Sequence, residues 1–229
     1  GPGLGGIQAS QADYWQATKA PGHGDLHILV FAPSSVQEMV DMVGKAFSLA
    51  DKYRMPAMIL ADGMLGQMME PVVLCEPDEV EKPQKPWAVT GHKNERDHNI
   101  ITSLFLTPEE LEETVVNRFK RYEIIEQEEP IAENYMTDDA EIIVVSYGAC
   151  ARVVKSAIDA ARKKGISVGL IRPITLWPFP QKALEAAAVN AKSFLCVEMS
   201  MGQMLDDVKL AISCSSPVSF FGRTGGIIP

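Results

Sequence analysis

The residue types most suggestive of chemistry stand at the start of the chain, which is rich in glycine. Glycines occupy positions 1, 3, 5 and 6, with Leu4 among them and Ile7 and Gln8 after them. A dinucleotide-binding loop needs a strand before it, a helix after it and an acidic residue about 20 positions later. No strand precedes these glycines in the sequence, so a nicotinamide site is disfavoured. Because glycine lacks a Cβ, the segment instead lets the backbone approach a ligand or another chain closely.

Two further polar groups form a possible secondary site. His23 lies two residues before Asp25, and a histidine beside a carboxylate can act as an acid–base pair. The alternative, which we favour, is a turn in which Asp25 accepts backbone hydrogen bonds. Asp62 and Gln67 follow a predicted strand, at the end where parallel sheets place their sites. The methionines around them either line a pocket or pack in the core, and both interpretations stay open.

The remaining reactive residue types point to no metal centre. The four cysteines stand at positions 75, 150, 196 and 214, too far apart for a zinc or iron–sulfur motif. Without a secretory signal, reduced thiols and a cytoplasmic location are expected, with Cys150 and Cys196 in the core. His92 and His98 lie in a charged stretch, where we expect exposure to solvent rather than metal binding.

The charge of the chain argues against two classes of partner. The formal net charge is −9, which disfavours binding to nucleic acid or to an anionic membrane. No apolar run approaches the roughly 18 residues of a membrane span. The acidic residues are concentrated between residues 76 and 141, a segment with 18 acidic and seven basic side chains. We interpret this segment as a hydrophilic connector, with an acidic docking patch as the alternative.

The first region, residues 1–73, is predicted to contain a short helix at 11–18 and one β-α-β unit. Its strands are expected at 26–32 and 56–61, and the helix between them implies parallel pairing. Ser35 and Glu38 have the spacing of a capping box at the start of that helix. Its apolar residues at 3.6-residue spacing are expected to face the core: Val36, Met39, Val40, Val43, Phe47 and Ala50.

Residues 74–139 are predicted to form an acidic connector with one helix. Thr107 and Pro108 mark the start of that helix, with the threonine as its cap. An apolar stripe on it is expected to be buried and comprises Leu111, Val115, Phe119 and Tyr122. A stretch of this length is too long for a single loop, so we expect a structured arm that crosses between two domains.

Residues 140–229 are predicted to form a doubly wound parallel α/β domain. Strands are expected at 141–147, 167–172, 193–198 and 218–221, and helices at 150–164, 180–190 and 202–212. The segment 172–180, rich in proline and tryptophan, is expected to be a rigid exposed loop suited to a protein interface. The glycine-rich character of both ends also leads us to expect a piece of a longer polypeptide.

Seven segments, taken in order, resemble the alpha subunit of 2-oxoacid:ferredoxin oxidoreductases, closest to the 2-oxoisovalerate (branched-chain) type. They are GPGLGGIQ with SQADYWQATK, GHGD, APSSVQEMVD, LADGMLGQMMEPV, RPITLWPFP, VEM with MGQM, and GRTGGIIP. The resemblance covers essentially the whole chain. It implies the end of a thiamine-diphosphate pyrimidine-type domain, then the connector, then a transketolase C-terminal-like domain.

The resemblance also implies an activity, cofactors and partners. The activity is oxidative decarboxylation of a 2-oxoacid to acyl-CoA, with electrons passed to ferredoxin. Thiamine diphosphate and Mg²⁺ would be shared with a beta subunit, an iron–sulfur cluster would lie on another subunit, and coenzyme A would be the co-substrate. Beta, gamma and ferredoxin-like delta subunits are the implied partners in a homo- or hetero-oligomer.

The resemblance assigns no catalytic residue to this chain, because the family's glutamate and substrate-binding arginine would precede Gly1. The piece is therefore expected to be inactive alone. The implied oxoacid-pocket residues are Gly3, Leu4, Gly5, Gly6, Ile7 and Gln8. An apolar Ile7 suits a branched aliphatic substrate. The alternative is a non-catalytic assembly module, and binding of coenzyme only when the beta partner is present would distinguish the two.

Overall fold

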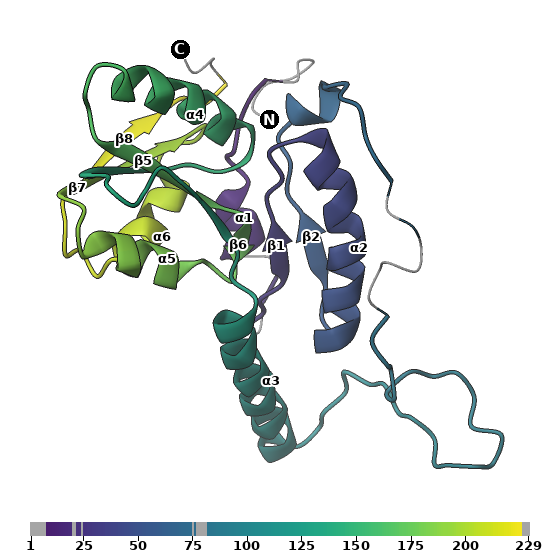
Figure 1. Cartoon of the computed structure of the whole chain (residues 1–229). Coiled ribbons are helices and arrows are strands. Elements are labelled where there is room, and N and C mark those ends of the chain that lie inside the picture. The colour runs from purple at the N-terminus through teal and green to yellow at the C-terminus, as the bar shows by residue number, and fades with distance from the viewer. Residues whose placement is uncertain (1–7, 20–21, 24, 75, 77–81, 226–229) are drawn as a thin grey trace.

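The molecule contains two β-sheets, and one short strand from the C-terminal part of the chain belongs to the sheet of the N-terminal part. The computed structural model describes residues 8–19, 22, 23, 25–74, 76 and 82–225 (Figure 1). One sheet has three strands in the order β2-β1-β6, and the other has five in the order β3-β5-β4-β7-β8. Helices and largely parallel strands alternate along the chain, so the predicted α/β class is confirmed.

The three-stranded sheet contains the predicted β-α-β unit. Strands β1 (Leu29–Phe31) and β2 (Ala57–Ile59) pair in parallel and are connected by α2 (Val36–Tyr53). Strand β6 (Thr175–Trp177) pairs antiparallel with β1, although it comes from the far end of the chain. A short helix, α1 (Tyr14–Thr18), packs against the second sheet's helix α6.

The five-stranded sheet follows the predicted order of strands and helices. Its elements are β3 (Ala132–Tyr135), β4 (Ile142–Val145), α4 (Gly148–Arg162), β5 (Val168–Pro173), α5 (Gln181–Ala188), β7 (Ser193–Glu198), α6 (Gln203–Ala211) and β8 (Val218–Gly222). Four strands are parallel, and β3, which was not predicted, adds an antiparallel edge. Helix α4 covers one face, and α5 and α6 cover the other (Figure 1). Burial on both faces explains the continuous apolar run of β4.

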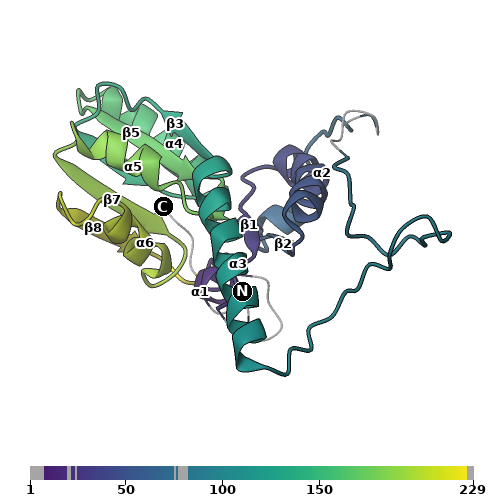
Figure 2. The ribbon, with the colours of Figure 1, turned by 90° about the horizontal axis from the view of Figure 1, so that it is seen from below.

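Helix α3 (Pro108–Glu128) begins where predicted, but its buried face differs from the prediction. Tyr122 and Ile125 are buried, whereas Leu111 is 49% exposed and Phe119 is 39% exposed. Residues 82–107 run as a loop away from both sheets and return to the start of α3 (Figures 1 and 2). Only the end of the helix therefore reaches the core. The Thr107 side chain makes no capping hydrogen bond, so that part of the prediction is wrong.

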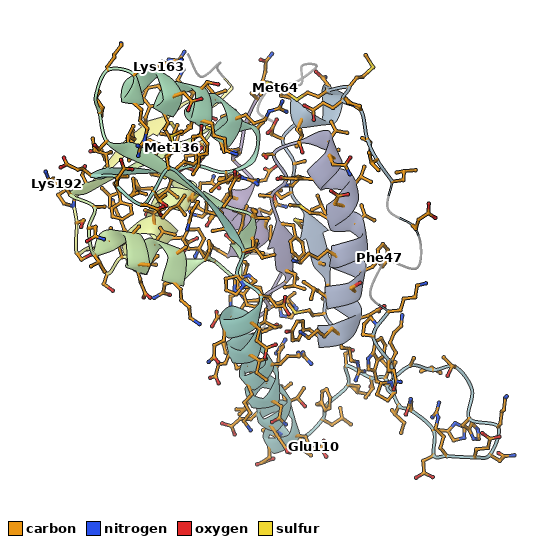
Figure 3. All side chains as sticks on the ribbon, in the orientation of Figure 1. Phe47, Met64, Glu110, Met136, Lys163 and Lys192 are labelled. Carbon is orange, nitrogen blue, oxygen red and sulfur yellow. The ribbon has the colours of Figure 1, made fainter. Side chains whose placement is uncertain are left out.

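Helix α2 also turns a different face to the core than predicted. Met42 and Leu49 are each 7% exposed, whereas Val43 is 46% and Phe47 69% exposed. Figure 3 shows Phe47 on the outer side of the helix. Two apolar stripes lie side by side on α2, and periodicity alone cannot tell which one meets the sheet. The capping box is half formed. The Ser35 Oγ accepts from the Glu38 N–H at 3.1 Å, but the Glu38 carboxylate accepts from the N–H of Ser34 and not from that of Ser35.

The segment 172–180 is not the exposed loop that was predicted. Leu176 is 1% and Trp177 7% exposed, because β6 joins the three-stranded sheet. The Trp177 ring stacks on the His27 ring with their centroids 4.9 Å apart. The proline-rich segment thus ties the two sheets together inside the molecule. Among the helices in the described residues, none has the length and apolar character that crossing a bilayer would require.

Candidate functional site

A small polar cavity lies at the carboxyl ends of parallel strands from both sheets. Its walls come from the segments that follow β2 and β4 and from the chain before α1: Ser10, Gln11, Asp13, Leu60, Ala61, Asp62, Tyr147 and Gly148. The cavity measures about 20 Å³. That volume holds about one water molecule. The position is the one where open parallel sheets place their ligands.

Gln11 fixes the start of the described chain to the five-stranded sheet. Its backbone N–H donates to the Met199 carbonyl at 2.8 Å, and its side-chain oxygen accepts from the Met199 N–H at 2.8 Å. Its Nε2 donates to the Tyr147 carbonyl at 2.9 Å. Gln8 lies three residues before this anchor. The three hydrogen bonds therefore fix the position of the chain at Gln11.

Asp62 divides its carboxylate between a structural role and the cavity. Its Oδ1 accepts from the Met64 and Leu65 N–H groups at 2.9 and 3.0 Å and so starts the short 3-10 helix η1 (Leu65–Gln67). Its Oδ2 is buried without a hydrogen-bond partner among the described residues. Such an oxygen is costly to bury unless a water or a ligand donates to it. The Asp62 Oδ2 can therefore accept a hydrogen bond at this edge of the sheets.

Gly148 gives the cavity its shape. It begins α4 with a φ of +59°, and a Cβ built there would lie 3.1 Å from the Gln11 Nε2 and 3.9 Å from the Asp62 Oδ2. A side chain at this position would fill the space between the two polar groups. Glycine is required both for the backbone conformation and for the close approach of Gln11.

The hydroxyl of Tyr147, in the cavity wall, and the thiol of Cys150, in the first turn of α4, stay protonated at neutral pH. Burial raises the pKa of Tyr147 well above its usual range, and the nearby Glu198 carboxylate acts in the same direction. Burial also raises the pKa of Cys150 to about 11. Cys150 and Cys196 are both buried and free, as predicted, so neither thiol is a reactive nucleophile. The site can bind and orient a ligand but does not present an activated nucleophile.

A buried arginine joins the two sheets beside this site. Arg172 is 3% exposed, and its Nε donates to Glu133 at 2.6 Å while its two terminal nitrogens donate to Glu38 at 3.0 and 2.7 Å. Burial raises the pKa of Glu38, but hydrogen bonds from Arg172 and Ser34 outweigh it, so the pKa lies below its ordinary value. Glu38 therefore holds the first turn of α2 to Arg172 on β5, and Glu133, whose pKa is also lowered, binds the same arginine from β3.

The structure separates the residues of the predicted secondary site. Asp62 lines the small cavity, His23 and Asp25 line a different cavity beside α3, and Gln67 is exposed at the end of η1. Gly3, Leu4, Gly5, Gly6 and Ile7 lie outside the described residues, and Gln8 is exposed. The rings of His92 and His98 lie with their centroids 3.9 Å apart and are tilted by 50°, and no group of three potential metal ligands occurs within the described part of the chain.

Several residues of the site carried no signal in the sequence. Gln11 and Tyr147 are joined by hydrogen bonds in which the side chain of each donates to the main-chain carbonyl of the other, 136 positions away. Gly148 follows a predicted strand directly, and that position could have marked it as a close-approach glycine. Glu38 looked like a capping residue, and only the fold shows that it binds Arg172.

Comparison with known families and structures agrees with this architecture. Residues 2–138 match the family described as "Pyruvate flavodoxin/ferredoxin oxidoreductase, thiamine diP-bdg", and residues 140–229 match "Pyruvate:ferredoxin oxidoreductase core domain II". A solved 2-oxoglutarate:ferredoxin oxidoreductase from Magnetococcus marinus superposes with a TM-score of 0.74 at 20% identity, covering 99% of this chain and 44% of that one. This likeness establishes the fold.

Two curated relatives are similar along nearly the whole chain. The ketoisovalerate oxidoreductase subunit VorB of Methanothermobacter marburgensis is 49% identical over 99% of this chain, and the 2-oxoglutarate synthase subunit KorA of the same organism is 33% identical over 96%. The chain spans 64% and 65% of the lengths of these two relatives. The resemblance found in the sequence is confirmed, and the chain belongs to the pyruvate flavodoxin/ferredoxin oxidoreductase family of thiamine-diphosphate-binding proteins.

Proposed function

We propose that the chain is part of the alpha subunit of a thiamine-diphosphate-dependent 2-oxoacid:ferredoxin oxidoreductase that acts on a branched-chain 2-oxoacid. The observation that carries the proposal is the 49% identity with a ketoisovalerate oxidoreductase subunit, against 33% with a 2-oxoglutarate synthase subunit. In the proposed reaction, a 2-oxoacid and coenzyme A give acyl-CoA, carbon dioxide and a proton. The two electrons released reduce two molecules of ferredoxin, each by one electron.

The described residues do not form a coenzyme site on their own. The cavity at the shared strand ends measures about 20 Å³, far less than a thiamine ring requires, and the described residues contain no cluster able to hold a metal ion. When bound, thiamine diphosphate supplies the carbanion chemistry of decarboxylation. We propose that a beta subunit contributes its diphosphate and Mg²⁺ site, and we expect this chain alone to be inactive.

Within that arrangement the chain's own role is to position the substrate. We propose that the segment Gly3–Gln8 lines the oxoacid pocket, with Ile7 against the aliphatic part of the substrate. The Gln11 anchor supports this, because its hydrogen bonds to Met199 and Tyr147 fix the chain three residues after Gln8. The unpartnered Asp62 Oδ2 beside Gln11 would hold a water or accept a hydrogen bond at the same edge.

The remaining expectations belong to the same proposal. We propose a division into residues 1–73, 74–139 and 140–229, which the start of a family match at residue 140 supports. We also propose gamma and ferredoxin-like delta subunits as partners, an iron–sulfur cluster on another subunit and a cytoplasmic location. A purely structural role is the competing proposal, since the described residues lack an activated nucleophile.

The proposal is tested by assaying the purified complex that contains this chain. With coenzyme A, thiamine diphosphate, Mg²⁺ and a one-electron acceptor, we expect the highest kcat/KM with 2-oxoisovalerate, ahead of 2-oxoglutarate and pyruvate. Preference for 2-oxoglutarate would refute the branched-chain assignment. Full activity of a complex from which this chain is omitted would refute both the catalytic role and the assembly role.

A substitution at Ile7 tests the assignment of the substrate pocket. Ile7→Thr in the complex removes apolar surface and adds a hydroxyl, so the ratio of kcat/KM for 2-oxoisovalerate to that for 2-oxoglutarate should fall about tenfold. Ile166→Thr, on an exposed turn of the other sheet, is the matched control and should leave the ratio unchanged. An unchanged ratio in Ile7→Thr would contradict the pocket assignment.

A further inference from the structure

A second, much larger cavity lies beside helix α3. It measures about 770 Å³, is open to solvent on one side, and is lined by α3, by residues 102–105 at the end of the connector loop and by the short segment before β1. Its polar lining includes His23, Thr102, Ser103, Asn117, Arg118 and Arg121. Ligand cavities in proteins measure roughly 300–1,000 Å³. The size is therefore that of a site for an organic molecule, and it is separate from the cavity at the strand ends.

Among the described residues, the two arginines of this cavity have no hydrogen-bond or ion-pair partner. Neither Arg118 nor Arg121 forms a hydrogen bond or an ion pair within the described residues, and the Nε of each is buried without an acceptor. The contrast with other arginines is clear: Arg152 binds Glu70, Arg162 binds Asp139 and Arg172 binds two glutamates. A buried donor without an acceptor costs about 1–3 kcal/mol, more for a charged group.

The acidic residues in the first turn of α3, Glu109 and Glu110, form no ion pair with either arginine (Figure 3 labels Glu110). Arg118 and Arg121 are three residues apart and thus neighbours on one face. That same face turns Leu111, Thr114 and Val115 toward the cavity, which explains why the apolar stripe predicted for α3 is not in the core.

We propose that this cavity binds a phosphate-bearing organic anion. Two guanidinium forks one helical turn apart match the several oxygens of a phosphate, and such charge-assisted bonds are roughly twice as strong as neutral ones. The hydroxyls of Thr102 and Ser103 and the His23 ring add donors around the same space.

The rest of the lining indicates an organic group attached to the phosphate. Phe105, Leu111 and Val115 give the cavity an apolar wall, which a bare inorganic ion would leave uncovered. Asp25 adds a carboxylate, which repels a second anionic group but accepts a hydrogen bond from a hydroxyl or an amine. A sugar or nucleoside phosphate has groups that can contact the arginines, the apolar wall and the Asp25 carboxylate at the same time. The inference concerns a cavity separate from the proposed oxoacid pocket, and it shares a ligand class with the proposed function, because coenzyme A also carries a nucleoside phosphate.

Calorimetry on the purified complex at low ionic strength tests the proposal, with AMP and inorganic phosphate as probes. We expect AMP to bind at least tenfold more tightly than phosphate. Arg118→Gln and Arg121→Gln should each weaken AMP binding at least tenfold, since a hydrogen bond to a charged group contributes about 1.5–3 kcal/mol. Phe105→Ala should weaken AMP but not phosphate.

Lys93→Gln is the matched control, because it removes one positive charge from the connector loop outside the cavity and should change the dissociation constant less than twofold. Far-UV circular dichroism of each variant verifies that α3 is intact. The proposal is overturned if the complex binds neither probe at millimolar concentration, or if AMP binding is unaffected by loss of both arginines. Binding of a polyglutamate peptide in place of AMP would also overturn it and would indicate an acidic protein segment instead.

Discussion

The two sheets differ in how fully each covers its own apolar residues. Among the described residues, 16 large apolar side chains are exposed in the 123 residues before Ala140 and only six in the 86 residues from Ala140 onward. In the five-stranded sheet, helices cover both faces, and Ile143 and Val145 are almost fully buried. In the three-stranded sheet, α2 leaves Val43 and Phe47 open to solvent.

The difference shows in which regions the periodicity of apolar residues identifies the core. A region that buries its apolar residues within its own fold turns every apolar stripe inward, so a stripe in the sequence identifies the core. A region with more apolar surface than its own sheet can cover carries stripes of two kinds, and only one of them meets the sheet. The outer faces of α2 and α3 and the connector loop leave more apolar side chains exposed than the five-stranded sheet, where Phe220 and Phe221 of β8 are 37% and 41% exposed.

The largest effect is expected at the junction between the two regions. Arg172→Met leaves Glu38 without its ion-pair partner and leaves Glu133 paired with Lys155 alone, so the free energy of unfolding should fall by about 3 kcal/mol. Chemical denaturation measures this, and a split into two transitions would show that the sheets have been uncoupled. Lys192→Met, which breaks an exposed pair with Glu141, should cost less than about 0.5 kcal/mol. Equal losses in both variants would contradict a structural role for Arg172.

The two faces of α2 give the sharpest test of the comparison. Leu49→Ala should lower the free energy of unfolding by about 3 kcal/mol, because it opens a cavity in the core. Phe47→Ala, two residues earlier and mostly exposed, should change it by less than about 0.5 kcal/mol.

Assembly should show the opposite order. If the outer face of α2 contacts a partner subunit, Phe47→Ala reduces the yield of assembled complex on size-exclusion chromatography while the chain itself stays folded. A Phe47→Ala chain that unfolds as readily as Leu49→Ala would show that the outer face belongs to the core after all.

A pair of glycines tests the cavity at the strand ends. Gly148→Ala introduces a Cβ 3.1 Å from the Gln11 Nε2 at a φ of +59°, so we expect a loss of about 2 kcal/mol. Gly165→Ala, at a φ of +81° with open space around the new Cβ, should lose about 1 kcal/mol from backbone strain alone. Thermal unfolding of both variants gives the comparison. A loss in Gly148→Ala no larger than in Gly165→Ala would mean that Gln11 moves aside freely.

Much of the fold could be predicted from the sequence because it depends on local pattern. The order of strands and helices after residue 140 follows from short apolar runs and capping residues, and β7 was predicted at its observed bounds. Strand β6 was missed because its partner, β1, lies more than 140 residues earlier, and proline-rich sequence argued for a loop. The faces of α2 and α3 were missed because burial there depends on which surfaces meet in space.

The candidate site was predictable only in part. Asp62 was found because it follows a strand, and parallel sheets gather such residues at one edge. Gln11 and Gly148 act through main-chain contacts between distant segments, which no spacing rule captures. Arg118 and Arg121 looked like ordinary solvated charges on a connector helix, and only the absence of acceptors around them in three dimensions marks them as unusual.

The smallest expected effect is a change in how stability depends on pH, and it again distinguishes the ion pairs of Arg172 from an exposed ion pair. Burial raises the pKa of Glu133, but hydrogen bonds from Lys155 and Arg172 outweigh it, so its pKa in the folded protein lies below the ordinary 4.5. A carboxylate of this kind stabilises the fold at pH above its unfolded pKa and loses that contribution as the pH falls toward its folded pKa. Because the side chain is 31% exposed, the contribution is about 0.5 kcal/mol. Stability measured between pH 6 and pH 3 should therefore fall less steeply in Glu133→Gln than in the unmodified protein, whereas Glu141→Gln at an exposed pair should keep the original slope. Equal slopes in all three proteins would mean that Arg172 is held by Glu38 alone.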